Sequence, residues 1–175
     1  MTRRVAFLRA VNVGRRTVQM SRFASALEGL GYRDVWTHIN SGNAVFDADG
    51  SGGDLEQAIE QALEAEFGFE CTTFVRTVTE LRKVLDAEPF ALDEGDTYFV
   101  TFLKSTPEAA VARALEASSN EFDTLVVVGR DVHWRMHGKS TDTLLKKQDW
   151  AVVGEHASTS RNTTMLRKLV AKLES

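Results

Sequence analysis

The chain has 175 residues, a formal net charge of −4 and a hydrophobic fraction of 43%. This length suits one ordinary domain or two small ones, and the hydrophobic fraction excludes wholesale disorder. The net negative charge argues against a general nucleic-acid binder. The single cysteine, Cys71, excludes an intramolecular disulfide and a zinc site made of several thiolates.

The predicted elements of the first half alternate between strands and helices. Ser21 can cap the first helix, and Gly31 follows its end. Asp54 with Gln57 resembles a capping box that opens the second helix. The pattern predicts strands over 3–10, 35–40, 44–47 and 71–76 and helices over 21–30 and from 54 to about 67. This order is β-α-β-β-α-β, the ferredoxin-like split arrangement.

The second half repeats most of that element order without visible sequence repetition. Thr77 with Glu80 forms a capping-box pair that opens a helix, which ends before Pro89. Pro107 suits the first position of a later helix. The remaining pattern predicts strands over 97–104, 125–128 and 132–136, and helices over about 143–147 and 163–173. We therefore expect an α+β protein with two ferredoxin-like halves, 1–77 and 78–175, whose mainly antiparallel sheets have helices packed on one face.

The sequence carries no sign of a membrane protein. The apolar patch after Arg3 and Arg4 ends at Arg9, so it is too short for the core of a signal peptide. No apolar run approaches the ~20 residues that a membrane span needs. A lone cysteine suits a reducing compartment. We expect a cytoplasmic protein that does not contact membranes, and the sequence does not indicate its oligomeric state.

Charge is distributed unevenly along the chain. Residues 1–47 carry a net charge of +4, residues 48–123 carry −12 and residues 124–175 carry +4. If the two ends of the chain meet, they form a basic surface that focuses an anionic ligand. The alternative is that acidic helices face solvent and the asymmetry has no function.

Three short stretches combine arginine with small polar residues at predicted strand and helix ends. They are residues 8–14, 39–43 and 158–163, the last of which we expect to open the final helix. Arginine on a strand needs partners for its guanidinium, and helix N-termini bind anions. The predicted ligand-binding residues are Arg9, Asn12, Gly14, Ser41, Gly42, Asn43, Arg161 and Asn162. The alternative is structural: Ser158 to Asn162 only cap a helix, and Arg9 forms a salt bridge.

Common catalytic and cofactor motifs are missing from the sequence. Neither of the two frequent glycine-rich phosphate loops occurs, and no Gly-x-Ser-x-Gly elbow marks a nucleophile. None of the four histidines has metal-ligand spacing on a helix, so we expect no metal site. Catalytic residues and cofactors therefore stay unassigned.

The same three stretches resemble a known family. Leu8-Arg9-Ala10-Val11-Asn12-Val13-Gly14, the Ser41-Gly42-Asn43 turn and Ser160-Arg161-Asn162 are similar, in the same order, to motifs of the small bacterial proteins called domain of unknown function 1697. This chain differs at Ala10 and Arg15, where glycine is common in the family, and at Ser160, where threonine is common. The resemblance implies a two-part ferredoxin-like α+β fold and no agreed activity.

These observations favour a binding module for a small anionic ligand that bears a phosphate or resembles a nucleotide. One alternative is single-stranded nucleic-acid binding on an open sheet face, although the aromatic signature of RNA-recognition domains is missing. A protein-interaction subunit and an unrecognised hydrolase or transferase are further alternatives.

Overall fold

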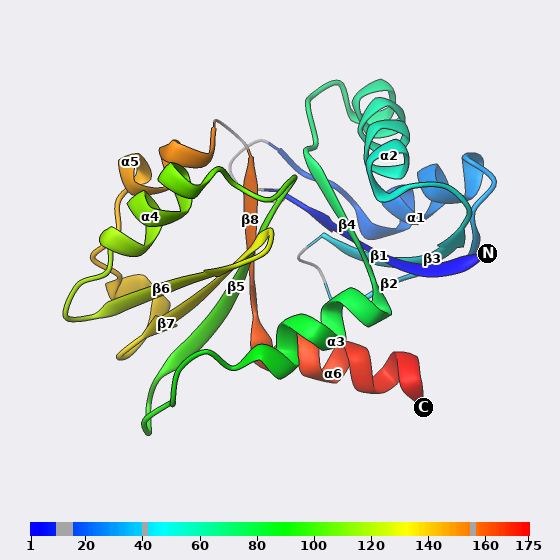
Figure 1. Ribbon diagram of the computed structural model, residues 1–175. Coiled ribbons are helices and arrows are strands. Elements are labelled where there is room, and N and C mark those ends of the chain that lie inside the picture. The colour runs from blue at the N-terminus through cyan, green and yellow to red at the C-terminus, as the bar shows by residue number, and fades with distance from the viewer. Residues whose placement is uncertain (10–15, 40–41, 155–156) are drawn as a thin grey trace. The chain divides into compact units, whose positions relative to one another are not determined.

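The computed structural model describes residues 1–9, 16–39, 42–154 and 157–175 of an α+β protein (Figure 1). The chain divides into two compact units, Met1–Leu81 and Arg82–Ser175. Each unit contains one four-stranded antiparallel sheet. Among the described residues, no helix is both long enough and apolar enough to span a bilayer.

The first unit has the element order expected from the sequence. Its sheet has the strand order β2-β3-β1-β4, with β1 hydrogen-bonded on both sides. This order is compatible with the ferredoxin-like arrangement. The elements are β1 (Thr2–Leu8), α1 (Met20–Gly29), β2 (Arg33–Thr37), β3 (Asn43–Ala48), α2 (Gly52–Phe67) and β4 (Thr73–Thr77).

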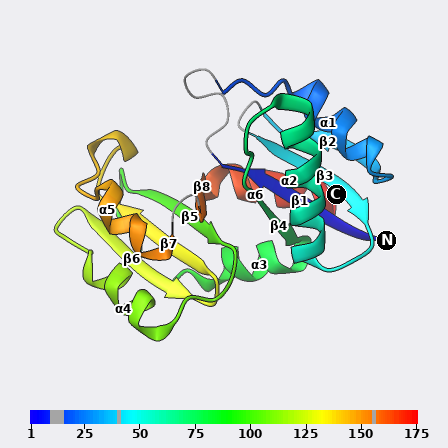
Figure 2. The same ribbon diagram turned by 90° about the horizontal axis from the view of Figure 1, so that it is seen from above.

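The core of the first unit lies between its sheet and the helices α1 and α2 (Figure 2). Alternate residues of a strand point to opposite faces, so Ala6 and Leu8 of β1 face the same side. On that side they pack with Phe23 of α1 and Ile59 of α2. Each of these side chains is almost fully buried, and burial of such groups contributes about 1.5–3 kcal/mol for a large apolar residue.

The second unit repeats this plan with short helical segments in place of a long second helix. Its strand order is β6-β7-β5-β8, and α3 crosses the division between the units. The elements are α3 (Val78–Ala87), β5 (Thr97–Leu103), α4 (Ala109–Ala117), β6 (Asp123–Val128), β7 (Asp131–Met136), η1 (Ser140–Asp142), α5 (Lys147–Trp150), η2 (Ala151–Val153), β8 (Ser158–Asn162) and α6 (Thr163–Glu174). The boundary expected after residue 77 falls at the junction of β4 and α3.

One predicted loop is a strand. Residues 158–163 were expected to open the last helix, but Ser158–Asn162 form β8 and pair with β5. A polar run without alternating apolar residues gives no strand signal, so β8 depends on the partner strand rather than on its own sequence. Only Asn162 caps α6: its side-chain oxygen accepts a hydrogen bond of 2.8 Å from Thr164 N.

The helix starts follow the predictions in one case and depart from them in others. The capping box is confirmed, because Thr77 Oγ1 accepts from Glu80 N at 3.1 Å and Glu80 Oε2 accepts from Thr77 N at 2.7 Å. By contrast, α2 is capped by Ser51 rather than Asp54. Helix α1 begins before Ser21, and α5 begins at residue 147 rather than 143.

Helix side chains cover outward-facing amides on two edge strands. In the first unit, Glu56 Oε2 of α2 accepts from Val75 N of β4 at 3.1 Å. In the second unit, Glu116 Oε2 of α4 accepts from Val127 N of β6 at 3.2 Å. Just beyond α4, Ser119 Oγ accepts from Leu125 N at 3.0 Å. These edge amides therefore have partners within their own unit.

The buried carboxylate of Asp123 joins separate segments of the second unit. Asp123 is 0% exposed and lies at the start of β6. It accepts hydrogen bonds from Trp134 Nε1 at 2.8 Å, Thr143 Oγ1 at 2.6 Å and Leu144 N at 2.9 Å. Several donors are needed to offset the desolvation of a buried carboxylate, and here they tie β7 and the segment after η1 to β6.

We expect Asp123→Ala to reduce the free energy of unfolding by about 3 kcal/mol, because it leaves buried donors without an acceptor. Asp142→Ala removes an exposed carboxylate from the same unit and is expected to change it by less than about 0.5 kcal/mol. Urea denaturation followed by circular dichroism measures both values. Equal effects of the two substitutions would contradict the structural role of Asp123.

Candidate functional site

In the first unit, two of the predicted stretches meet at the carboxyl end of β1. Leu8 N donates to Gly42 O at 2.8 Å, and Phe7 pairs with Asn43 of β3. On the other side of β1, Arg9 N donates to Thr72 O at 2.9 Å. The first residue after β1 is therefore held between the start of β3 and the segment that leads into β4.

Gly42 and Asn43 shape the turn beside this strand end. Gly42 has a φ of 79°, a left-handed conformation that favours glycine. Asn43 is fully buried, and its Nδ2 donates to His38 O at 3.0 Å. His38 N in turn donates to Asn43 O at 3.0 Å. Both residues thus fix the backbone path between β2 and β3, which is a structural role that turn chemistry predicts.

The predicted residues of the C-terminal stretch belong to the second unit, and Asn12, Gly14 and Ser41 lie outside the described residues. Arg161 is 8% exposed and donates from one guanidinium nitrogen to Thr159 Oγ1 at 2.8 Å and Ser160 O at 2.9 Å. Burial lowers the pKa of Arg161 to about 10. Its charge is held inside the unit by uncharged oxygens and by further contacts, as a buried cation requires.

A buried tyrosine–histidine pair lies on the same sheet face as Arg161. Val100 of β5 pairs with both His133 and Arg161, so the three side chains point to one side. Tyr98 Oη lies 2.5 Å from His133 Nδ1. Burial lowers the pKa of His133 to about 4 and raises that of Tyr98 to about 12. Both groups are neutral at pH 7, and the tautomer of the imidazole decides which of the two donates the hydrogen bond.

We expect the wild-type protein to lose stability as pH falls from 6.5 towards about 4. In that window the unfolded chain binds a proton at His133 that the folded protein excludes, so the unfolded state gains. His133→Gln should flatten this part of the pH profile. Tyr98→Phe should lower stability at every pH but keep the slope, because it leaves the buried imidazole in place. Urea titrations at several pH values make the comparison, and an unchanged slope in His133→Gln would contradict it.

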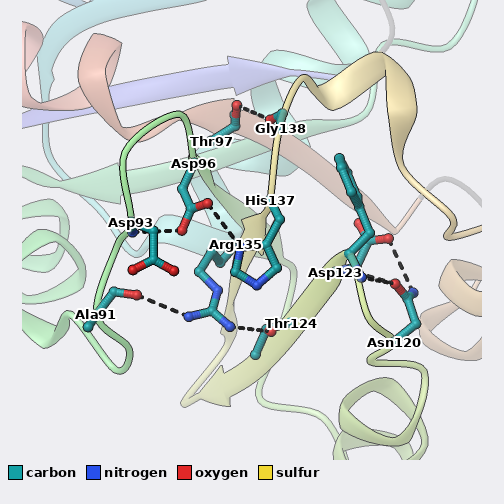
Figure 3. A network of polar contacts seen from close by, with 11 residues as sticks. Ala91, Asp93, Asp96, Thr97, Asn120, Asp123, Thr124, Arg135, His137 and Gly138 are labelled. Atoms are coloured by element: carbon teal, nitrogen blue, oxygen red, sulfur yellow. Dashed lines mark hydrogen bonds and ion pairs between the residues drawn. The ribbon is translucent and has the colours of Figure 1, made fainter.

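A second polar cluster joins the loop before β5 to the end of β7 (Figure 3). Asp96 Oδ1 lies 3.0 Å from His137 Nδ1, and Asp96 Oδ2 accepts from Asp93 N at 2.8 Å. The Asp96 side chain is 3% exposed. Nearby, Arg135 donates to Ala91 O at 3.0 Å and to Thr124 Oγ1 at 2.9 Å. The network therefore fastens this loop to β6 and β7.

These groups are of types that bind metal ions. One ligand atom each from Asp93, Asp96 and His137 lies within 4.8 Å of the other two, and carboxylate oxygens with imidazole nitrogen suit zinc and related cations. The positive charge of Arg135 is close enough to lower the pKa of Asp96, so it also opposes a cation here. We assign the cluster a structural role.

The Asp96 carboxyl makes the pH dependence of this cluster testable. Burial alone would raise its pKa, but hydrogen bonds from Asp93 N and His137, together with nearby positive charge, lower the pKa below 3.8. The stabilising contribution of Asp96 is thus present above pH 3.8 and is lost as pH falls through the lowered value. We expect Asp96→Asn to be destabilising at pH 6 and nearly neutral below the folded pKa. Asp93→Asn, an exposed control, should show a smaller effect at pH 6.

Two basic residues at the carboxyl end of β5, Lys104 and Arg130, are not among the residues predicted from the sequence. Leu103 N donates to Arg130 O at 3.0 Å, and Arg130 Nη1 donates to Lys104 O at 3.4 Å. The signal that could have found them is an internal repeat. Residues 2–9 read Thr-Arg-Arg-Val-Ala-Phe-Leu-Arg and residues 97–104 read Thr-Tyr-Phe-Val-Thr-Phe-Leu-Lys, which contradicts the expectation of no visible repetition.

Comparisons with known proteins agree with this architecture. A family model described as "Protein of unknown function (DUF1697)" matches residues 1–133. The solved structure of the conserved bacterial protein SP0830 from Streptococcus pneumoniae is similar over 100% of this chain and 99% of that chain, with a TM-score of 0.75 and 20% sequence identity. None of the curated proteins matches this chain. At 20% identity the likeness concerns the fold alone.

Proposed function

Because this chain belongs to the DUF1697 family of proteins of unknown function, we propose its function from its own residues: it binds a small anionic ligand, phosphate-bearing or nucleotide-like, at the carboxyl end of β1. The supporting observation is the convergence of Arg9, Gly42 and Asn43 at that strand end. A guanidinium forms charge-assisted hydrogen bonds with phosphate that are about twice as strong as neutral ones.

The anchoring of the backbone around Arg9 supports a binding role. The Arg9 amide bonds to Thr72 O, and the preceding amide bonds to Gly42 O, so the Cα of Arg9 has a fixed position. Its side chain is only partly buried. Because the backbone is already fixed, a ligand needs to order only the Arg9 side chain, which favours affinity.

We extend the proposed site to nearby residues of the same two sequence stretches. Asn12 and Gly14 follow Arg9 by three and five residues, and Ser41 directly precedes Gly42. A carboxamide, a backbone N–H and a hydroxyl can each donate a hydrogen bond to phosphate. Arg161 and Asn162 belong to the second unit, so their role in ligand binding is a separate prediction that is not part of the site at β1. Residues 1–47 carry a net charge of +4, which favours anions near that segment, whereas residues 48–81 carry −7 and make the first unit as a whole net negative.

A thermal-shift panel on wild type and Arg9→Gln tests the proposal. The panel contains nucleotides, coenzymes, sugar phosphates and short single-stranded oligonucleotides. A ligand at 100 times its dissociation constant stabilises the folded protein by roughly 2.7 kcal/mol, which is a clear shift. We expect a phosphate-bearing hit whose effect falls at least about tenfold in apparent affinity in Arg9→Gln, because one charge-assisted contact is lost.

Arg33→Gln is the matched control, because Arg33 is an exposed arginine of the same unit and its loss changes the net charge equally. Unfolding of each variant without ligand shows whether the variant is folded as stably as wild type. If Arg9→Gln binds the hit as wild type does, the site is not at β1. A hit restricted to oligonucleotides with a strong salt dependence would support nucleic-acid binding instead.

A further inference from the structure

We propose that the carboxyl end of β5 is a second anion-binding site, in which Lys104 and Arg130 supply the positive charge for a phosphoryl group. The site shares no residue with the proposed site at the end of β1, because Lys104 and Arg130 lie in the second unit. The first argument compares the two sheets, and it rests on the proposed function of the end of β1. The second argument uses only the geometry around Lys104 and Arg130.

The two sheets are equivalent strand by strand. In the first unit, Val5 of the central strand pairs with Val45 of β3 and Arg76 of β4. In the second unit, Val100 pairs with His133 of β7 and Arg161 of β8. The matched strands also have equal lengths: β1 and β5 have 7 residues, β3 and β7 have 6, and β4 and β8 have 5. Each residue of these three strands therefore has a defined counterpart in the other sheet, whereas β2 and β6 differ in length and register.

The equivalence extends to a buried arginine near the end of the last strand. Arg76 donates from Nη1 to the carbonyl of the residue before it, Val75, at 3.2 Å. Arg161 makes the same bond to Ser160 O at 2.9 Å. In both units the strand ends at the next residue, Thr77 or Asn162, and a helix begins directly after it. The repeated module is therefore β-α-β-β-helix-β-α. It includes the carboxyl ends of β1 and β5.

The contact between α3 and α6 shows the same repetition. Arg82 of α3 forms an ion pair with Glu174 of α6. Arg167, the counterpart of Arg82 in α6, forms an ion pair with Glu88 just beyond α3 at 2.8 Å. The two arginines are counterparts and each pairs with a glutamate, although the glutamates stand at positions that differ by one residue between the modules.

Applied to the proposed site, this equivalence selects Lys104 and Arg130. The bond from Leu8 N to Gly42 O has its counterpart in the bond from Leu103 N to Arg130 O. Lys104 therefore occupies the position of Arg9, and Arg130 that of Gly42. A cation follows the central strand in both modules, and the second module adds another cation on the neighbouring turn.

The local geometry supports anion binding without reference to the repeat. The Arg130 guanidinium lies against the main chain of Lys104, with Nη1 3.4 Å from Lys104 O. Both side chains are partly exposed, so a solute can reach them. Both residues also make other contacts within the protein, and a phosphoryl group at this strand end gains charge-assisted hydrogen bonds from the two cations.

Asp131 introduces a difference between the two modules. It occupies the position of Asn43, so a carboxylate replaces a carboxamide next to Arg130. A carboxylate near the binding place repels an anion. We therefore expect the β5 site to bind phosphate more weakly than its positive charges alone would allow, and to improve when that carboxylate is neutralised.

The experiment is an NMR titration of the full-length protein with inorganic pyrophosphate. Chemical-shift changes of the backbone amides near Leu103, Lys104 and Arg130 report the β5 site, and those near Leu8, Arg9 and Gly42 report the β1 site. We expect Lys104→Gln/Arg130→Gln to weaken the first set of changes at least about tenfold and leave the second set unchanged. Arg9→Gln should do the reverse, so failure of one site does not imply failure of the other.

Two further variants complete the test. Lys83→Gln/Arg113→Gln removes the same charge from exposed positions of the second unit and should leave both titrations as in wild type. Asp131→Asn should tighten binding at the β5 site severalfold. The proposal is overturned if pyrophosphate causes no saturable change near Lys104 and Arg130, or if the control variant weakens binding as much as Lys104→Gln/Arg130→Gln.

Discussion

The pairing of one central strand on both of its sides is the constraint on which each unit depends. In the first unit β1 is paired with β3 and β4, and this register decides that Ala6 and Leu8 face the helices. The same register ends at Leu8, so it also decides where Arg9 leaves the sheet. A slip of one residue would exchange the two faces and move the cation away from the turn. Core packing and the position of the proposed ligand contacts are thus consequences of a single strand register.

Three buried polar side chains of the second unit show how the free-energy cost of burying polar and charged groups is reduced. The carboxyl oxygens of Asp123 accept several hydrogen bonds, whereas His133 is neutral and shares a hydrogen bond with Tyr98. Arg161 stays charged because its pKa begins far above neutrality, even after burial lowers it. The three residues illustrate three ways of reducing the cost of burial: saturation with donors, loss of charge, and contact with hydroxyl and carbonyl oxygens.

The fold could be predicted where hydrophobic alternation and turn residues agree, as in β1, β3 and the hairpin of β6 and β7. It could not be predicted for β8, because a run of serine and threonine around Arg161 becomes a strand only through its partner β5. The predicted N-cap was wrong where more than one residue could cap a helix. Both Ser51 and Asp54 could cap α2, and the structure shows that Ser51 does. The convergence of Arg9, Gly42 and Asn43 follows from turn chemistry and was accessible to sequence reasoning. Lys104 and Arg130 were missed because their importance appears only when the two modules are compared.

The side chains of Glu56, Glu116 and Ser119 at the sheet edges have a consequence for behaviour in a crowded solution. An unprotected edge strand offers unpaired N–H donors to an extended segment of another molecule. Such intermolecular pairing is the first step of β-sheet aggregation. Here α2 and the end of α4 occupy donors of β4 and β6. These three side chains therefore protect the edges of β4 and β6 from pairing with strands of other molecules.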